Sequence, residues 1–215
     1  MKLVVLASGR GSNLRAIAAA IDAGRCGASL AAVVSDRASA EALLFATERG
    51  IPTAIISPKA HPTREAWDAA LADCIAAFEP SVVVLAGFMR IVGPAMIARF
   101  PHRILNVHPA LLPSFPGAHG ARDALAKGVR ISGCTVHIVD AGVDTGPILA
   151  QAAVPVLQSD DQASLQARIQ KVEHRLYPAV IEAIRLGEIT LSETPLIRTQ
   201  IDPGQALLVS GFPND

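Results

Sequence analysis

Short apolar runs alternate with amphipathic segments along the first half of the chain. Runs such as SVVVLAG carry no polar alternation, which is typical of strands covered on both faces of a parallel sheet. The pattern predicts strands at 2–7, 30–35, 53–56, 81–87 and 103–108, and helices at 12–23, 39–49, 63–78 and 94–99. This β-α order predicts a doubly wound, Rossmann-like α/β fold with a mostly parallel sheet.

The rhythm changes in the C-terminal half of the chain. Residues 131–139 and 147–156 predict two strands joined by a turn short enough for an antiparallel pair, so we expect antiparallel strands in this half. A long helix follows them. We expect a capping box of Ser159 and Gln162 to open it and Gly187 to end it.

Composition narrows the class of protein. Apolar residues make up 51% of the chain and aromatic residues 4%, which predicts an aliphatic core. Lys and Arg together number 19, as do Asp and Glu, so a surface for nucleic acid is not favoured and small-molecule partners are expected. The longest apolar runs are about half the length of a membrane span, so no membrane partner is expected. Nothing in the sequence decides whether the chain forms a homodimer.

The N-terminus and the cysteines point to one compartment. The opening MKLVVLASGRG lacks the cleavage pattern of a signal peptide. Cys26, Cys74 and Cys134 are odd in number and far apart, which favours reduced, buried thiols. No Cys or His lies at metal-ligand spacing from them, so no metal is expected. We therefore expect a cytoplasmic protein.

A glycine-rich loop, ASGRGSNL at residues 7–14, links the first strand to the first helix. Its backbone N–H groups suit an anion, and Ser12 and Asn13 either cap the helix or donate to a phosphate. A purely structural turn is one alternative. A dinucleotide fingerprint is another, with Asp36 placed to meet a ribose, although Leu14 occupies the third glycine position.

A second candidate site follows the strand at 103–108. Asn106 and His108 are two residues apart, so both side chains leave the same face of the strand. An amide and an imidazole together suit an oxyanion that develops from a carbonyl. The turn DAGVDTGP offers Asp140 or Asp144 as the carboxylate that orients the histidine and raises its pKa. A packed histidine and simple turn chemistry are the structural alternatives.

These motifs resemble the phosphoribosylglycinamide formyltransferase family of the formyltransferase superfamily. The resemblance rests on ASGRGSNL, VVVLAGFMRI, NVHPALLPSFPG and HIVDAGVDTGPIL, in that order, and covers residues 1 to about 185. It implies transfer of a formyl group from the co-substrate 10-formyltetrahydrofolate to the amine of N1-(5-phospho-D-ribosyl)glycinamide. The products would be the N-formyl compound and tetrahydrofolate, in de novo purine (IMP) biosynthesis.

The resemblance also implies a role for each matching residue. The catalytic set would be Asn106, His108 and Asp144, with His108 held protonated by Asp144. The phosphate and ribosyl part of the substrate would meet Gly11, Ser12, Asn13, Gln170 and Glu173. The folate would meet Arg64, Met89, Arg90, Ile91, Val92, Asn106, Asp140, Ala141, Gly142, Val143 and Asp144. His119 and His137 also lie within matching motifs, but we favour a satisfied strand residue for His137.

We expect residues 1–215 to form one formyltransferase domain. Within it, 1–100 would be the phosphate-binding half and 101–190 the catalytic and folate-binding half. The last part of the domain, 191–215, would be a tail. The pattern over residues 188–215 predicts a weak hairpin and a loose end.

Other functions stay open at this point. Methionyl-tRNA formyltransferase would need a further tRNA-binding domain, and a formyltetrahydrofolate deformylase normally carries a regulatory domain before the catalytic one. A nicotinamide-dependent oxidoreductase would use Asp36 and the glycines. The last alternative is a non-catalytic module that binds nucleotide or folate.

Overall fold

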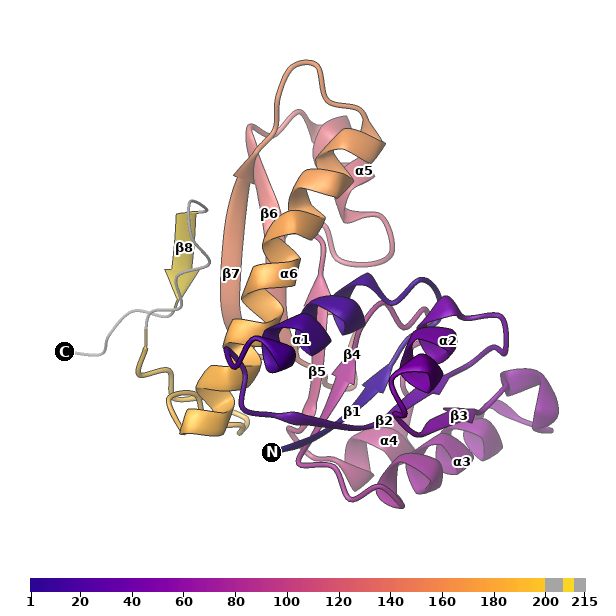
Figure 1. Ribbon diagram of the computed structural model, residues 1–215. Coiled ribbons are helices and arrows are strands. Elements are labelled where there is room, and N and C mark those ends of the chain that lie inside the picture. Colours follow the sequence, from indigo (N-terminus) through magenta and orange to yellow (C-terminus); the bar gives the residue numbers. More distant parts are fainter. Residues whose placement is uncertain (200–206, 211–215) are drawn as a thin grey trace. The chain divides into compact units, whose positions relative to one another are not determined.

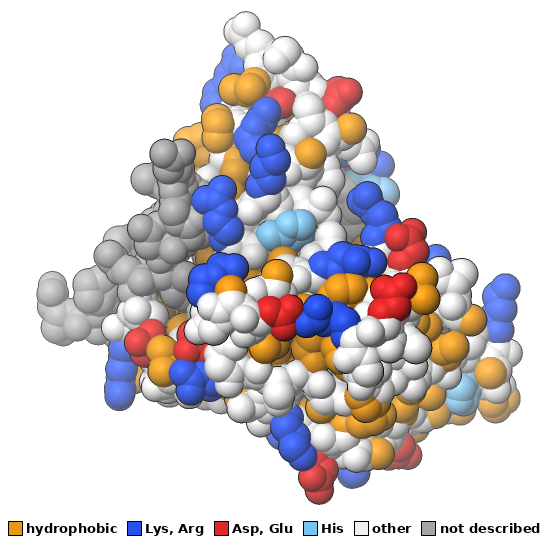
Figure 2. Space-filling view, in the orientation of Figure 1, with side chains coloured by type: hydrophobic (Ala, Val, Ile, Leu, Met, Phe, Trp, Pro, Cys, Tyr) orange, Lys and Arg blue, Asp and Glu red, His pale blue; other side chains and the backbone are white. Residues whose placement is uncertain are grey.

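The computed structural model describes residues 1–199 and 207–210 of the chain (Figure 1). The chain divides into two compact units, Met1–Asn106 and Val107–Asp215. Basic and acidic side chains share the face seen in Figure 2, as expected for a formal net charge of zero.

The first unit is built on parallel strands in the order β3-β2-β1-β4-β5. The strands are β1 (Lys2–Leu6), β2 (Ser29–Ser35), β3 (Thr53–Ile55), β4 (Val82–Leu85) and β5 (Ile104–His108). The helices are α1 (Ser12–Asp22), α2 (Glu41–Glu48), the 3₁₀ helix η1 (Pro58–Ala60), α3 (Arg64–Ala76) and α4 (Pro94–Arg99). Strand β4 is buried along its whole length, which explains its unbroken apolar sequence.

The order of these strands places the loops that matter for function. The chain builds outward from β1 to β3 and then returns to add β4 on the other side of β1. Ligands of open α/β sheets bind at the carboxyl ends of the strands where the order reverses in this way. The loops that follow β1 and β4 therefore lie at the expected ligand-binding position of the first unit.

The second unit holds antiparallel strands. Strand β6 (Ile131–Ile138) pairs with β7 (Ile148–Pro155), and β7 pairs with β8 (Leu207–Ser210). Helix α5 (Gly120–Lys127) packs against α6 (Gln162–Leu186), and α6 packs against β6 and β7 (Figure 1). The predicted α/β fold, mostly parallel with antiparallel strands in the C-terminal half, is confirmed.

The second unit corrects the sequence interpretation at the start of α6 and in the predicted loose end. The capping box that opens α6 is formed by Asp161 and Ser164, not by Ser159 and Gln162. In the tail, an antiparallel bridge joins Ile189 to Ile197, which agrees with a weak hairpin. The part predicted as a loose end contains β8, and its residues 200–206 and 211–215 lie outside the described residues.

We predict that Gly133→Ala strongly destabilises the β6–β7 pair. A Cβ at this position would lie 2.0 Å from the Ala152 carbonyl oxygen of the neighbouring strand. Separating the two backbones should cost at least about 2 kcal/mol of unfolding free energy. Urea unfolding followed by circular dichroism measures this, with Ser132→Ala as the control. The Ser132 Oγ is buried and has no hydrogen-bond partner within the described part of the chain, so a loss of equal size in the control would contradict the prediction.

Candidate active site

The glycine-rich loop of the first unit leads directly into α1. Gly11 is the N-cap of this helix and has a positive φ of 69°, and its carbonyl accepts the first helical bond from Arg15 N at 2.9 Å. The expectation that Ser12 or Asn13 caps the helix is wrong, because both lie inside it and the N-cap residue has no side chain. The start of α1 suits an anion, and phosphate binding by Gly11, Ser12 and Asn13 stays a prediction.

Asp36 follows β2, where the dinucleotide alternative needs a ribose ligand, but its carboxylate already has protein partners. Its Oδ2 accepts a hydrogen bond from Arg90 Nε at 2.8 Å, and Arg37 Nε lies 3.6 Å from Oδ1. Burial acts to raise the pKa of Asp36, but the hydrogen bonds from Ser8 and Arg90 and the nearby arginine charges outweigh it and lower the pKa. The feature that favoured an oxidoreductase is thus part of an internal ion pair.

Two arginines expected to bind folate have structural contacts of their own. The sequence makes Arg90 look out of place without a ligand, yet it pairs with Asp36. The Arg64 guanidinium lies 4.2 Å from the ring centroid of Trp67, which is a cation–π contact within α3. Around Arg90, Met89 and Ile91 are exposed and Val92 is buried. Folate binding by these residues stays a prediction.

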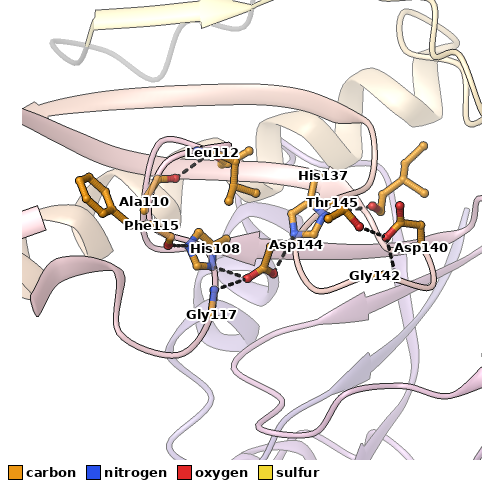
Figure 3. A network of polar contacts seen from close by, with 12 residues as sticks. His108, Ala110, Leu112, Phe115, Gly117, His137, Asp140, Gly142, Asp144 and Thr145 are labelled. Atoms are coloured by element: carbon orange, nitrogen blue, oxygen red, sulfur yellow. Dashed lines mark hydrogen bonds and ion pairs between the residues drawn. The ribbon is translucent and has the colours of Figure 1, made fainter. Parts of the chain in front are cut away.

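His108 lies at the end of β5 and is almost fully buried. Its Nε2 lies 2.8 Å from the carbonyl oxygen of Phe115, and its Nδ1 lies 3.3 Å from Asp144 Oδ2 (Figure 3). The proline-rich loop that follows β5 therefore folds back onto the histidine. In this loop the Leu112–Pro113 peptide bond is cis. The predicted pairing of His108 with Asp144 rather than Asp140 is confirmed.

Asp144 is the centre of the polar network drawn in Figure 3. It lies in the turn between β6 and β7 with a positive φ of 55°. Its Oδ2 accepts a hydrogen bond from Gly117 N at 2.8 Å as well as facing His108. Its Oδ1 lies 3.6 Å from His137 Nε2. One carboxylate thus joins β5, the proline-rich loop and β6.

Asp140 shapes the turn that carries Asp144. Its Oδ1 accepts hydrogen bonds from Gly142 N at 3.0 Å and from Thr145 Oγ1 at 2.7 Å (Figure 3). Ala141, Gly142 and Val143 are exposed along the same turn. Their expected contact with folate stays a prediction.

Sequence reasoning gave His137 too small a role. Its Nδ1 lies 3.0 Å from the Ile138 carbonyl oxygen, in agreement with a satisfied strand residue, but its Nε2 also faces Asp144. The contact joins residues seven apart on either side of a turn, so neither strand alternation nor local spacing reveals it. The only sequence signal was the position of His137 in the same motif as Asp144.

The pKa of His108 lies below its ordinary value. Burial has the largest effect and lowers it, because desolvation disfavours the imidazolium, and the charge of His137 acts in the same direction. The Asp144 carboxylate and the Phe115 carbonyl raise it without offsetting burial. In the protein alone Asp144 therefore does not raise the pKa of His108 above its ordinary value, and protonation of His108 during the reaction stays a prediction.

We predict that Asp144→Asn lowers the pKa of His108 further. The substitution removes the charge that favours the imidazolium and leaves the lowering effect of burial in place. An NMR titration of the histidine ring resonances measures the change. Asp123→Asn, which removes a carboxylate paired with Arg122 on α5, should leave the His108 titration unchanged. A His108 pKa that rises in Asp144→Asn would contradict the assigned contact.

The remaining predicted site residues lie on α6. Gln170 and Glu173 are three positions apart, so both project from one side of this helix, and Glu173 is buried. Burial raises the pKa of the Cys134 thiol on β6, and the charge of Glu173 adds to this effect. Within the described residues Cys26, Cys74 and Cys134 form no disulfide. Cys26 and Cys134 are buried, as predicted, but Cys74 is only partly buried.

No group of three or more His, Cys, Asp or Glu side chains among the described residues is arranged to hold a metal ion. None of the helices in the described part of the chain is long and apolar enough to cross a membrane.

Comparisons with known proteins agree on one family. The profile described as formyl transferase matches residues 1–181. The chain is 50% identical over 192 residues to phosphoribosylglycinamide formyltransferase of Mycobacterium tuberculosis, covering 88% of this chain and 87% of that protein. It is 42% identical over 193 residues to the Escherichia coli protein of the same name, covering 90% and 91%. The crystal structure of glycinamide ribonucleotide transformylase 1 from Symbiobacterium toebii matches with a TM-score of 0.89 at 46% identity, covering 92% and 93%.

Proposed function

The chain belongs to the formyl transferase family, and we propose that it is a phosphoribosylglycinamide formyltransferase. It transfers the formyl group of 10-formyltetrahydrofolate to the amine of N1-(5-phospho-D-ribosyl)glycinamide, in de novo purine (IMP) biosynthesis. The products are the N-formyl compound and tetrahydrofolate. One observation carries the proposal. Buried His108, which lies two residues after Asn106 on β5, contacts the Asp144 carboxylate.

The reaction begins when the glycinamide amine attacks the formyl carbon. The carbonyl oxygen becomes negative in the tetrahedral adduct, and Asn106 donates a hydrogen bond to it. His108 donates as well once its Nε2 turns from the Phe115 carbonyl, which it faces in the protein alone, to the adduct oxygen. The neutral ring favoured in the protein alone still carries one N–H. The charge that develops on the adduct oxygen then favours the imidazolium, because a nearby anion stabilises the cation.

The adduct must also move a proton from the attacking amine to the departing folate nitrogen. We assign this transfer to a water held by the Asp144 carboxylate. The pKa of Asp144 is lowered: burial raises it, but hydrogen bonds from His137 and Gly117 and the charges of His108 and His137 outweigh burial. A carboxylate that stays ionised can accept a proton from such a water.

The other predicted residues bind the two substrates. The phosphate and ribosyl glycinamide would be held by Gly11, Ser12, Asn13, Gln170 and Glu173. The folate would be held by Arg64, Met89, Arg90, Ile91, Val92, Asn106, Asp140, Ala141, Gly142, Val143 and Asp144. Holding the reacting atoms together supplies much of the remaining acceleration. We propose a cytoplasmic location, with no nucleic acid or membrane as partner.

A turnover assay tests the proposal. The protein is mixed with 10-formyltetrahydrofolate and phosphoribosylglycinamide, and loss of the formyl group from the folate is followed. We expect formyl release to require the amine. Release at an equal rate without the amine would show a deformylase, and binding of both substrates without turnover would show a binding module.

A further inference from the structure

A surface segment, residues 86–93, connects β4 to α4 in the first unit. It follows the strand at which the strand order reverses, and it contains the residues Met89 to Val92 to which we assign folate. Met89 and Ile91 are 68% and 64% exposed, so apolar burial does not determine the conformation of its middle. Phe88 and Val92 are buried near its two ends.

Asp68 holds the end of this segment that leads into α4. It lies on α3, and it is 2% exposed although it carries a carboxyl group. Its Oδ1 accepts a hydrogen bond from Gly93 N at 2.6 Å, and its Oδ2 accepts from Ala95 N at 2.8 Å and from Met96 N at 3.2 Å. A residue of one helix thus satisfies the first N–H groups of another, whose own N-cap, Gly93, has no side chain to do so.

The close approach of Asp68 also explains the glycine. Gly93 has a φ of −100°, which any residue adopts. A Cβ there, however, would lie 2.6 Å from both Cγ and Oδ2 of Asp68. The glycine is therefore needed for space rather than for backbone conformation. A substitution at either Gly93 or Asp68 would disturb the contact between them.

Two further polar contacts hold the other part of the segment. Met89 N donates to Ser8 Oγ at 2.9 Å, in the loop after β1. Arg90 Nε donates to Asp36 Oδ2 at 2.8 Å, at the end of β2, and the Asp36 side chain is fully buried. Three elements of the first unit therefore fix three points of the segment.

We propose that Asp68 is a positioning residue for the folate co-substrate, an inference that rests on the proposed function. By fixing Gly93, Asp68 sets the conformation in which the backbone of Met89 to Val92 binds the folate. Ser8 and Asp36 fix the same segment at Met89 and Arg90. Asp68 acts through Gly93 and touches no reacting atom. Loss of the contact lets the segment move, and the effect falls on the folate rather than on the amine substrate.

Steady-state kinetics of Asp68→Asn test this inference. The amide keeps the size of the side chain but offers one acceptor oxygen instead of two, so one side of the contact now meets an NH₂ group. We expect the KM for 10-formyltetrahydrofolate to rise about tenfold and the KM for phosphoribosylglycinamide to stay within about twofold, because a small displacement of a binding group has effects of this order or larger. Asp73→Asn, an exposed carboxylate on the same helix, is the control and should change neither KM.

A second variant keeps the test decisive if Asp68→Asn does not fold. Gly93→Ala displaces the contact from the opposite side and should raise the same KM selectively. Thermal unfolding of each variant separates positioning from stability. A lowered Tm with both KM values unchanged would show that Asp68 only stabilises the fold and would overturn the inference. Failure of the proposed function is a different result, since the unsubstituted protein would then show no amine-dependent turnover.

Discussion

Replacing His108 with alanine is expected to lower kcat/KM by about 100- to 1000-fold, or roughly 3–4 kcal/mol of transition-state stabilisation. The ring is buried, and the Phe115 carbonyl and the Asp144 carboxylate fix the positions of both of its nitrogens. Truncation therefore removes a preorganised donor that water cannot replace at equal strength. The amine-dependent release of the formyl group measures the loss.

Matched substitutions make the His108 experiment specific. His108→Gln keeps one N–H donor on a flexible chain and should retain more activity than alanine. His102→Asn changes an exposed histidine whose φ of 58° suits asparagine, and it should leave kcat/KM unchanged. Turnover of His108→Ala at the rate of the unsubstituted protein would remove the imidazole from the mechanism.

Replacing Asp144 should cause a loss of similar size, about 100- to 1000-fold in kcat. Asp144→Asn tests the charge rather than the shape. Asparagine tolerates the positive φ of 55°, and its amide oxygen can still accept from Gly117 N. The variant should fold with the same turn and still lose turnover, because it lacks the carboxylate that favours the imidazolium and to which we assign the proton-carrying water. An Asp144→Asn enzyme of normal kcat would show that only the geometry matters.

The same carboxylate makes a pH-dependent contribution to stability. Its pKa in the folded protein lies below the ordinary value of 3.8, so folding favours the ionised form. The stabilisation is fully present above that ordinary value and is lost as the pH falls through the lowered pKa. In Asp144→Asn this part of the acid sensitivity should be missing, which urea unfolding at a series of acidic pH values would reveal. Equal acid sensitivity in both proteins would contradict the assigned contacts.

Some features of the structure could be predicted from residues close together in the sequence. The helix at 94–99 has the bounds that the pattern predicted, because a proline can begin a helix and the apolar residues mark one face. Gly187 ends α6 with a positive φ of 76°, which glycine adopts at no steric cost. The relation of Asn106 to His108 follows from strand alternation alone.

The start of α6 shows where local rules were insufficient. Ser159 with Gln162 and Asp161 with Ser164 have the same spacing, but only the first pair matches the Ser/Thr-x-x-Glu/Gln pattern of a capping box. Asp160 decides between them. Its side chain accepts from Leu157 N at 2.8 Å and pairs with Arg168, which lies two turns along α6. This ion pair places the first turn of the helix after Asp160.

The sequence by itself determined the two polar motifs and the order of the strands and helices apart from η1, α5 and β8, because these features depend on periodicity and on residues close together in the chain. Only the tertiary structure decided which charges meet. The pairing of Asp36 with Arg90, the cap that Asp68 places on another helix and the approach of His137 to Asp144 all join segments that the sequence keeps apart. The pKa of His108 was decided there too, because burial is a property of the packed protein and outweighs the carboxylate beside the ring.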